Sequence, residues 1–221
     1  MRTIRVTGKG QIKVKPDMTR ITISQEKTYP EYQETLKKSA EDTEQLKTLL
    51  SAFGFDRSDL KTLHFNVDTE YESYREKDIY KQRFVGYKYS HVMKLEFDSD
   101  NERLGKILYA LANCPLHPEF RLSYTVKDPE SAKNEMLGRA VNDAKEKAAV
   151  LAKAAEICLK DIQSIDYSWG QINLEVQPMN RMLAADECCP TVGAKLESYD
   201  MDIEPDDIEV SDTVTVIWEI E

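Results

Sequence analysis

Long apolar runs are missing from the sequence. The N-terminal MRTIRVTG contains no apolar stretch of the roughly 7–15 residues found in a secretory signal. No segment approaches the about 20 apolar residues needed to cross a bilayer. The four cysteines, Cys114, Cys158, Cys188 and Cys189, show no convincing pairing. We therefore expect reduced thiols, no membrane insertion and a cytoplasmic location, or export if a leader has been removed.

Positive charge is in deficit. The 221-residue chain has 30 Lys and Arg residues against 40 Asp and Glu residues, which gives a net charge of −10. A surface of this sign repels phosphate backbones, so the composition predicts no nucleic-acid partner. The hydrophobic share of 41% is nevertheless large enough for a buried core in a chain of this length.

Histidine is scarce, and the sequence shows no catalytic or metal-binding motif. His91 falls on the apolar face of its strand and is interpreted as a hydrogen-bonded core residue, whereas His64 falls on the polar face. The segment Cys114-Pro-Leu-His117 lacks the second ligand pair of a zinc site, and the sequence contains no GxSxG, HExxH or phosphate-loop string. An acidic cluster could hold a hard cation but is interpreted as a solvated loop: Asp200, Asp202, Glu204, Asp206 and Asp207. The sequence thus predicts no catalytic residue, metal site or cofactor.

One pair of glycines raises the question of phosphate binding, in the segment VTGKGQIKVKPD at residues 6–17. The segment alternates with period two, and Gly8 and Gly10 fall on its apolar face, which predicts a half-buried strand. A phosphate loop would instead need glycines between a strand and a helix N-terminus. We interpret the glycines as a bend in the strand or as points of close approach by a helix, and Pro16-Asp17 as a hairpin turn to a second strand.

The rest of the chain changes repeatedly between helical and strand periodicity. Spacings of three and four residues predict helices at 30–54, 100–113 and 129–157. The first has an apolar stripe that includes Tyr32, Leu36, Ala40 and Leu46, and the third has alanines at 140, 144, 148 and 152 that we expect over Gly8 and Gly10. Alternation predicts strands at 62–71, 85–97, 120–126, 161–175 and 208–221, with the second hairpin formed by the first two of these.

This order, ββαββαβαββ, predicts an α+β fold in a single domain over residues 1–221. We expect one antiparallel sheet of about seven strands with three helices packed on it. Residues 176–207, which contain three prolines and both adjacent cysteines, are expected to form an irregular acidic loop.

The chain resembles the SIMPL-domain family, a bacterial family of unknown function. The matching segments span nearly the whole chain: IRVTGKGQIKVKPD, VGYKYSHVMKLEF, AVNDAKEKAAVLAKAAEICLKDIQSI and IEPDDIEVSDTVTVIWEI. Members often have Pro-Gly before the final strand, whereas this chain has Pro205-Asp206. The resemblance implies an α+β fold, a loose link to oxidative stress and the cell envelope, frequent export and no established catalytic residue. Within the matching segments we interpret five residues as structural: Gly8, Gly10, Pro16, Asp17 and Gly86.

The charged link YREKDIYKQR between the strands of the second hairpin is the candidate interaction surface. It combines both signs of charge with Tyr74, Ile79 and Tyr80, which suits a projecting arm that docks on a second copy of the chain. Long strand edges are usually blunted or paired, and this also favours self-association. A solvated hairpin tip on a monomer is the alternative. The flanking Tyr71, Tyr87 and Tyr89 are expected in the core.

Two functions remain open from the sequence. The first is a non-catalytic module that oligomerises or binds protein, with the stress-related role that the resemblance implies. The alternative is a small-molecule-binding protein or enzyme with a site under the 176–207 loop. A deep pocket with converging histidine, cysteine or carboxylate groups would favour the alternative.

Overall fold

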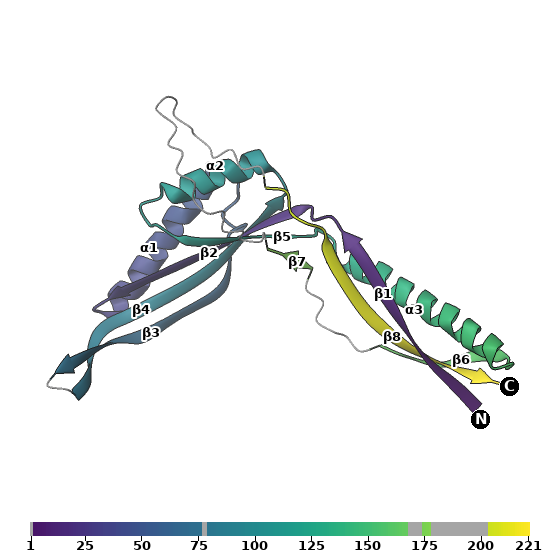
Figure 1. Ribbon diagram of the computed structural model, residues 1–221. Helices are drawn as coiled ribbons and strands as arrows, with labels where there is room; N and C mark the ends of the chain where they lie inside the picture. The colour runs from purple at the N-terminus through teal and green to yellow at the C-terminus, as the bar shows by residue number, and fades with distance from the viewer. Residues whose placement is uncertain (1, 77–78, 168–173, 178–202) are drawn as a thin grey trace, which may run out of the picture. The chain divides into compact units, whose positions relative to one another are not determined.

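The structure is a computed structural model, which describes residues 2–76, 79–167, 174–177 and 203–221 (Figure 1). Its helices are α1 (Tyr32–Ser51), α2 (Asn101–Ala112) and α3 (Pro129–Ala154). Its strands are β1 (Arg2–Val14), β2 (Met18–Tyr29), β3 (Lys61–Glu76), β4 (Ile79–Asp98), β5 (Glu119–Thr125), β6 (Leu159–Asp166), β7 (Glu175–Val176) and β8 (Ile208–Ile220). The predicted α+β class is confirmed. Among the described residues, no helix is long and apolar enough to cross a membrane.

The strands are divided between two antiparallel sheets, whereas the sequence predicts one. The first sheet has the order β1-β8-β6, and the second has the order β3-β4-β2-β5-β7. β1 pairs with β8 along its whole length, so strands from the two ends of the chain lie side by side. The division is not visible in the sequence because alternation defines the two faces of a strand but not its neighbours.

The predicted hairpin of the first two strands is wrong. β1 pairs with β8 and β2 pairs with β4, so Pro16 and Asp17 connect strands of different sheets. The Asp17 N–H donates to the Thr125 carbonyl oxygen at 3.2 Å, and Asp17 Oδ1 accepts from the Lys127 N–H at 2.8 Å. These bonds hold the connection against the end of β5, and they satisfy its polar groups without a hairpin.

The predicted hairpin of β3 and β4 is confirmed. The two strands pair antiparallel from Lys61↔Lys94 to Glu76↔Ile79, with a register shift between Glu70 and Tyr71. The strands therefore continue into most of the segment predicted as a charged link.

The chain groups into two compact units. Of the described residues, one unit comprises 2–17, 124–167, 174–176 and 205–221, and the other comprises 18–76, 79–123, 177 and 203–204. The single domain over residues 1–221 stays a prediction. Of the predicted 176–207 loop, residues 178–202 lie outside the described residues, and residues 203–207 form neither helix nor strand.

In the first unit, α3 packs on β1 and β8 through its alanine stripe. The buried face of the helix consists of Ala132, Met136, Ala140, Ala144, Ala148 and Ala152. A Cβ atom built on Gly8 would lie 2.0 Å from the Ala140 carbonyl oxygen, and one built on Gly10 would lie 2.0 Å from that of Met136. The helix backbone thus rests directly on the strand, over the two glycines as the spacing predicts, and no larger residue fits.

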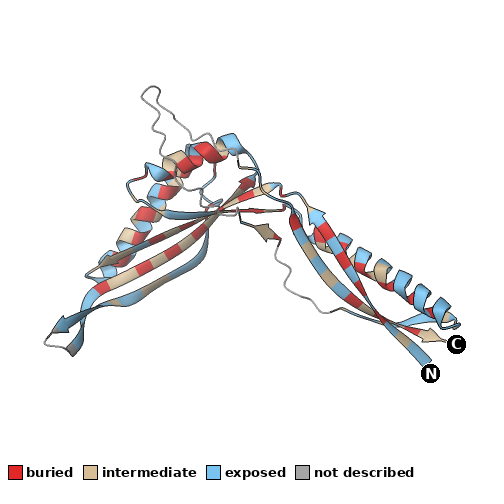
Figure 2. Cartoon of the chain, viewed as in Figure 1, coloured by how far each residue is buried: buried red, intermediate tan, exposed pale blue. Residues whose placement is uncertain are grey.

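In the second unit, α1 and α2 cover one face of β2 and β4. The core between them is formed by residues from all four elements, among them Ile21, Ile23, Leu46, Leu50, Met93, Leu95, Leu104 and Ile107. Buried residues alternate along β2 and β4, whereas the described residues of β3 are exposed or half-buried (Figure 2). β3 is the edge of its sheet and lies beyond the cover of α1, which packs on β4 and β2.

The contact between α3 and β1 can be tested with alanine. We expect Gly10→Ala to lower the free energy of unfolding by about 1–3 kcal/mol, because the new methyl group would overlap the helix backbone. Gly138→Ala, in α3 with no atom within 4 Å of the new Cβ, should instead be neutral or stabilise by up to about 1 kcal/mol. Urea unfolding gives both values. Equal effects of the two substitutions would contradict the close approach.

Candidate functional site

α1 presents polar side chains to the sheet in its N-terminal half. The buried residues of the helix recur at three- and four-residue spacing: Thr35, Ser39, Asp42, Leu46 and Leu50. Tyr32, Leu36 and Ala40, which belong to the apolar stripe predicted from the sequence, are exposed. The helix therefore contacts β2 and β4 through polar groups in its first half and through leucines in its second.

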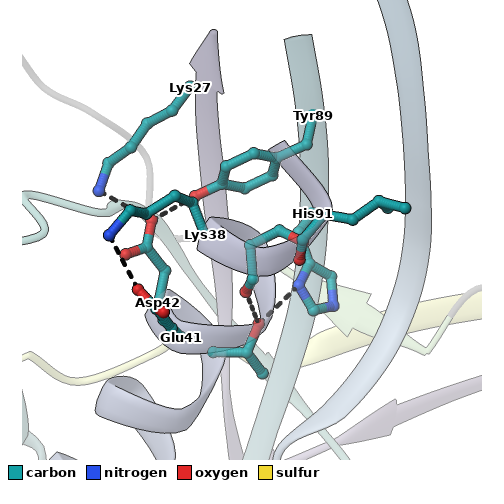
Figure 3. A network of polar contacts seen from close by, with 9 residues as sticks. Lys27, Lys38, Glu41, Asp42, Tyr89 and His91 are labelled. Carbon is teal, nitrogen blue, oxygen red and sulfur yellow. Dashed lines mark hydrogen bonds and ion pairs between the residues drawn. The ribbon is translucent and has the colours of Figure 1, made fainter. Parts of the chain in front are cut away.

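A buried carboxylate lies at the centre of this contact. Asp42 Oδ2 accepts hydrogen bonds from Lys27 Nζ of β2 at 2.8 Å and from the Tyr89 hydroxyl of β4 at 2.6 Å (Figure 3). The Asp42 side chain is 6% exposed and that of Lys27 is 34% exposed. Burial, and then the hydrogen bond to Asp42, raise the pKa of Tyr89, so its hydroxyl stays protonated and donates. The three side chains fix α1 to both strands.

His91 forms a second buried contact between α1 and the sheet. Its Nδ1 lies 3.1 Å from Thr43 Oγ1, and its Nε2 lies 2.9 Å from Thr62 Oγ1. The Thr43 hydroxyl donates to the Ser39 carbonyl oxygen at 2.8 Å, so it accepts from the Nδ1–H of His91. Nε2 then accepts from the Thr62 hydroxyl. Burial and the nearby charge of Lys47 lower the pKa of His91, which favours this neutral tautomer.

These contacts determine what the two clusters can do chemically. Both ring nitrogens of His91 are hydrogen-bonded to threonines. Both donors to Asp42 come from the strands that α1 packs on, Lys27 from β2 and Tyr89 from β4. General acid–base catalysis needs a titrating group within reach of a substrate proton. Here the protons of these groups are instead engaged in hydrogen bonds to other protein groups, which is typical of a structural polar network.

A groove runs between α1 and β3, and we call it the edge groove. It has a volume of about 440 Å³ and is open to solvent. Its lining consists of three apolar residues, Leu36, Ala40 and Phe65, and five polar ones, Ser39, Thr43, Glu44, Lys47 and His91. The Phe65 ring meets the His91 ring edge-on, with centroids 5.1 Å apart, and Phe65 remains 43% exposed. The groove therefore places three apolar side chains beside the exposed edge of the sheet.

Aromatic rings continue from the edge groove toward the end of the hairpin. We call this set the hairpin aromatic surface: Tyr32, Tyr71, Tyr80, Phe84 and Tyr87. Successive ring centroids are 5.3 Å apart for Tyr32 and Tyr87, 5.4 Å for Tyr87 and Phe84, and 5.7 Å for Phe84 and Tyr71. Tyr71 is 54% exposed and Phe84 is 44% exposed. The rings pack on one another and leave one side open to solvent.

The predicted core position of the three tyrosines is correct for only one of them. Tyr89 is fully buried, Tyr87 is half-buried, and Tyr71 is exposed. α1 begins at Tyr32, whose ring contacts Tyr87, and the hairpin extends beyond this end of the helix (Figure 1). Tyr71 is exposed because none of the described helices covers the hairpin there.

The candidate interaction residues of the predicted link are divided between two faces of the hairpin. Tyr80 is 76% exposed and pairs with Arg75, so alternation places it on the same face as Tyr71 and Phe84. Tyr74 is also exposed but lies on the opposite face. Ile79 begins β4, and its side chain lies outside the described side chains.

Gly86 has a structural position in β4. A Cβ atom built there would lie 2.3 Å from the Tyr29 carbonyl oxygen at the end of β2. The glycine therefore allows the two strands to approach next to the register shift at Glu70.

The predicted metal and thiol candidates are not brought together. Among the described residues, no group of three His, Cys, Asp or Glu side chains is placed to hold a metal ion. Cys114 is buried and Cys158 is exposed, and both are free thiols. Cys188 and Cys189 lie outside the described residues, as do Asp200 and Asp202 of the acidic cluster. The described part of the cluster, Glu204, Asp206 and Asp207, lies in the irregular segment before β8. The alternative site under the 176–207 loop falls mostly outside the described residues.

Sequence reasoning missed Asp42, Lys27 and the edge groove. One signal was present, because Asp42 occurs four residues before Leu46 and three after Ser39, on the buried face of the helix. Nothing in the sequence indicated that Leu36 and Ala40 would be exposed. The set that includes Leu36 and Ala40 and the set that includes Ser39 and Asp42 both satisfy helical spacing. Tertiary packing therefore decides which face of α1 contacts the sheet.

Comparison with known proteins gives one family. A family model described as SIMPL, protein of unknown function (DUF541), matches residues 4–218. None of the curated proteins matches the chain.

The Asp42 network can be tested by a double-mutant cycle. Asp42→Leu should lower the free energy of unfolding by about 2–4 kcal/mol, because the Tyr89 hydroxyl and Lys27 lose their acceptor. Adding Tyr89→Phe should cost less in this background than in the wild type, with a coupling of about 1 kcal/mol or more. Glu41→Leu removes a neighbouring carboxylate whose ion pair with Lys38 is partly exposed, and it should change stability by less than about 1 kcal/mol. Additive effects in urea unfolding would contradict the network.

His91 should make stability depend on pH. Its pKa is lowered in the folded state, so below the unfolded value of about 6.5 the unfolded chain binds a proton that the folded chain does not. The free energy of unfolding should therefore be highest above pH 6.5 and fall as the pH drops toward the folded pKa. His91→Gln should lose this part of the decline between pH 7 and pH 5, and His64→Gln serves as the exposed control. Parallel pH profiles for wild type and His91→Gln would refute the assignment.

Proposed function

The chain belongs to the SIMPL family, and from that premise we propose that it is a non-catalytic module that binds protein through the hairpin aromatic surface, with a second copy of the chain as its partner. The stress-related role implied for the family is the physiological setting of this proposal.

The observation that carries the proposal is the concentration of exposed apolar side chains. Most of the large hydrophobic residues exposed among the described part of the chain lie on β3, β4 and the start of α1: Tyr32, Leu36, Leu63, Phe65, Tyr71, Tyr74, Tyr80, Phe84 and Val85. Contiguous apolar patches on soluble proteins commonly mark interaction sites. Their concentration on the β3–β4 hairpin and the adjacent start of α1 supports binding by this part of the molecule.

The aromatic composition of the surface supports a protein partner. Tyrosine supplies a large contact area with few rotatable bonds and is enriched among residues that dominate binding energy. The rings of Tyr71, Phe84 and Tyr87 are already stacked edge to face, so binding would order few additional side chains. Such a preorganised surface can contact its own copy across a two-fold axis.

The polar network supports the non-catalytic part of the proposal. Asp42, Lys27 and Tyr89 bond to one another, and His91 bonds to two threonines. These groups stabilise the contact of α1 with the sheet, and the exposed surface beside them is apolar. The chemistry of the site thus favours binding over a reaction.

Light scattering after size exclusion tests the proposal. At micromolar concentration and over a hundredfold range, we expect the wild type to exceed the monomer mass of 25.4 kDa. The double substitution Tyr71→Ser/Phe84→Ser should lower the mass because it removes the centre of the hairpin aromatic surface. Tyr74→Ser, on the opposite face of the same hairpin, should leave the mass unchanged. A mass of 25.4 kDa for the wild type at every concentration would exclude self-association.

A further inference from the structure

The edge of β3 offers a second binding surface, separate from the hairpin aromatic surface. We infer that this edge, together with the edge groove, binds an extended segment of a partner protein in which apolar residues alternate with lysine or arginine. The segment would add to the sheet as a further strand. The inference extends the proposed protein-binding role, but it uses different residues and can fail independently.

The first observation is the unpaired edge itself. Among the described strands, β3 is the outermost of its sheet and pairs with β4 alone. In such a strand, every second residue directs its N–H and C=O groups away from the sheet, where another strand can bind them.

The second observation is that the other long edge is blunted. β1 is an outer strand of its own sheet, and α3 side chains bond to its backbone. The Lys9 N–H donates to Asp143 Oδ2 at 2.6 Å, and Arg139 Nη1 donates to the Gln11 carbonyl oxygen at 3.0 Å. Across Lys61–Glu72 of β3, the structure shows no corresponding bond from a side chain to the backbone of the strand. Of these two long edges, β3 is therefore the one at which addition is open.

The third observation is the groove beside this edge. Strand addition obtains affinity from main-chain hydrogen bonds and specificity from pockets that receive alternate side chains. Phe65, Val67 and Thr69 share the face of β3 that points to the α1 side, because they pair with His91, Tyr89 and Tyr87. Apolar side chains of an added strand would lie on this face, against Phe65, Leu36 and Ala40 of the edge groove.

Charged residues on the other face of β3 indicate which side chains the partner carries at its alternate positions. Asp68, Glu70 and Glu72 alternate with the apolar residues and share the opposite face. Glu72 forms an ion pair with Arg83, its partner in the register, at 2.7 Å. Lys88, which pairs with Asp68 in the register, instead forms its ion pair with Glu26 at 2.5 Å, so Asp68 and Glu70 are the carboxylates of the row that remain for a partner. The acidic row thus favours lysine or arginine at the alternate positions of an added strand.

The same charges disfavour a second β3 as the added strand. Antiparallel pairing of two copies about Asp68 would place the two Asp68 carboxylates opposite each other and Asn66 opposite Glu70. A shift by one pair would place Asp68 opposite Glu70. Like charges directly opposite each other destabilise a sheet, so a basic segment is the better occupant.

Fluorescence anisotropy with a labelled seven-residue peptide of alternating lysine and valine tests the inference. We expect saturable binding by the full chain, weakened by salt. The same peptide with glutamate for lysine should bind at least about tenfold more weakly, because it meets the acidic row. Failure of the lysine peptide to saturate, or equal binding of the glutamate peptide, would overturn the inference.

N-methylated peptides separate strand addition from general charge attraction. Methylation at every valine and methylation at every lysine block opposite edges of the added strand, because successive N–H groups alternate in direction. One of the two peptides should lose binding at least about tenfold and the other should keep it. Equal binding of both would show attraction without strand addition and would overturn the inference.

Substitutions in the protein distinguish this surface from the proposed one. Ala40→Arg should fill the edge groove and weaken binding of the lysine peptide at least about tenfold, whereas Gln45→Arg, an exposed α1 position outside the groove, adds the same charge as a control. Ala40→Arg should leave the oligomer mass unchanged, and Phe84→Ser, on β4, should leave peptide binding unchanged. Equal effects of Ala40→Arg and Gln45→Arg on peptide binding would overturn the role of the groove.

Discussion

The buried carboxylate of Asp42 determines where α1 lies on its sheet. A carboxylate taken out of water is costly unless it keeps charged or hydrogen-bonding partners, and Asp42 finds these on β2 in Lys27 and on β4 in Tyr89. A shift of α1 toward β3 would separate the carboxylate from Lys27. The helix is therefore held over β2 and β4, and β3 stays outside its cover. The exposed edge of β3 follows from this constraint.

The two units use different physical means to fix a helix on a sheet. In the first unit, alanines of α3 lie against Gly8 and Gly10, and the contact is specified by shape because any larger side chain would overlap the helix backbone. In the second unit, α1 is positioned by directional hydrogen bonds of Asp42 and His91. Polar contacts tolerate less sliding than an apolar layer does, since a displaced partner leaves a buried group unsatisfied. The polar contact is the one that lies beside the candidate binding surfaces.

The sequence predicts those parts of the fold that local periodicity determines. The alanine spacing of α3 identifies its buried face, and the alternation of β3 and β4 identifies their hairpin. The sequence does not predict strand partners, because the alternation of β1 is compatible with either β2 or β8 as its neighbour. The exposure of Tyr71 depends on where α1 begins, and that of Leu36 depends on which face of α1 contacts the sheet. Neither is encoded within a few residues. The candidate site therefore became visible only with the tertiary structure.

Two of the outer strands, β1 and β3, show how one chain treats its sheet edges differently. On β1, Asp143 and Arg139 occupy outward backbone groups, which removes that edge from pairing. On β3 the backbone stays accessible, and protection comes from the acidic row of Asp68, Glu70 and Glu72. Negative charge repels a second copy of the same edge but attracts a strand of opposite charge. The edge of β3 thus selects its partner by charge, whereas side chains of α3 block the edge of β1. An edge protected in this way can remain open for a partner while resisting edge-to-edge aggregation of identical chains.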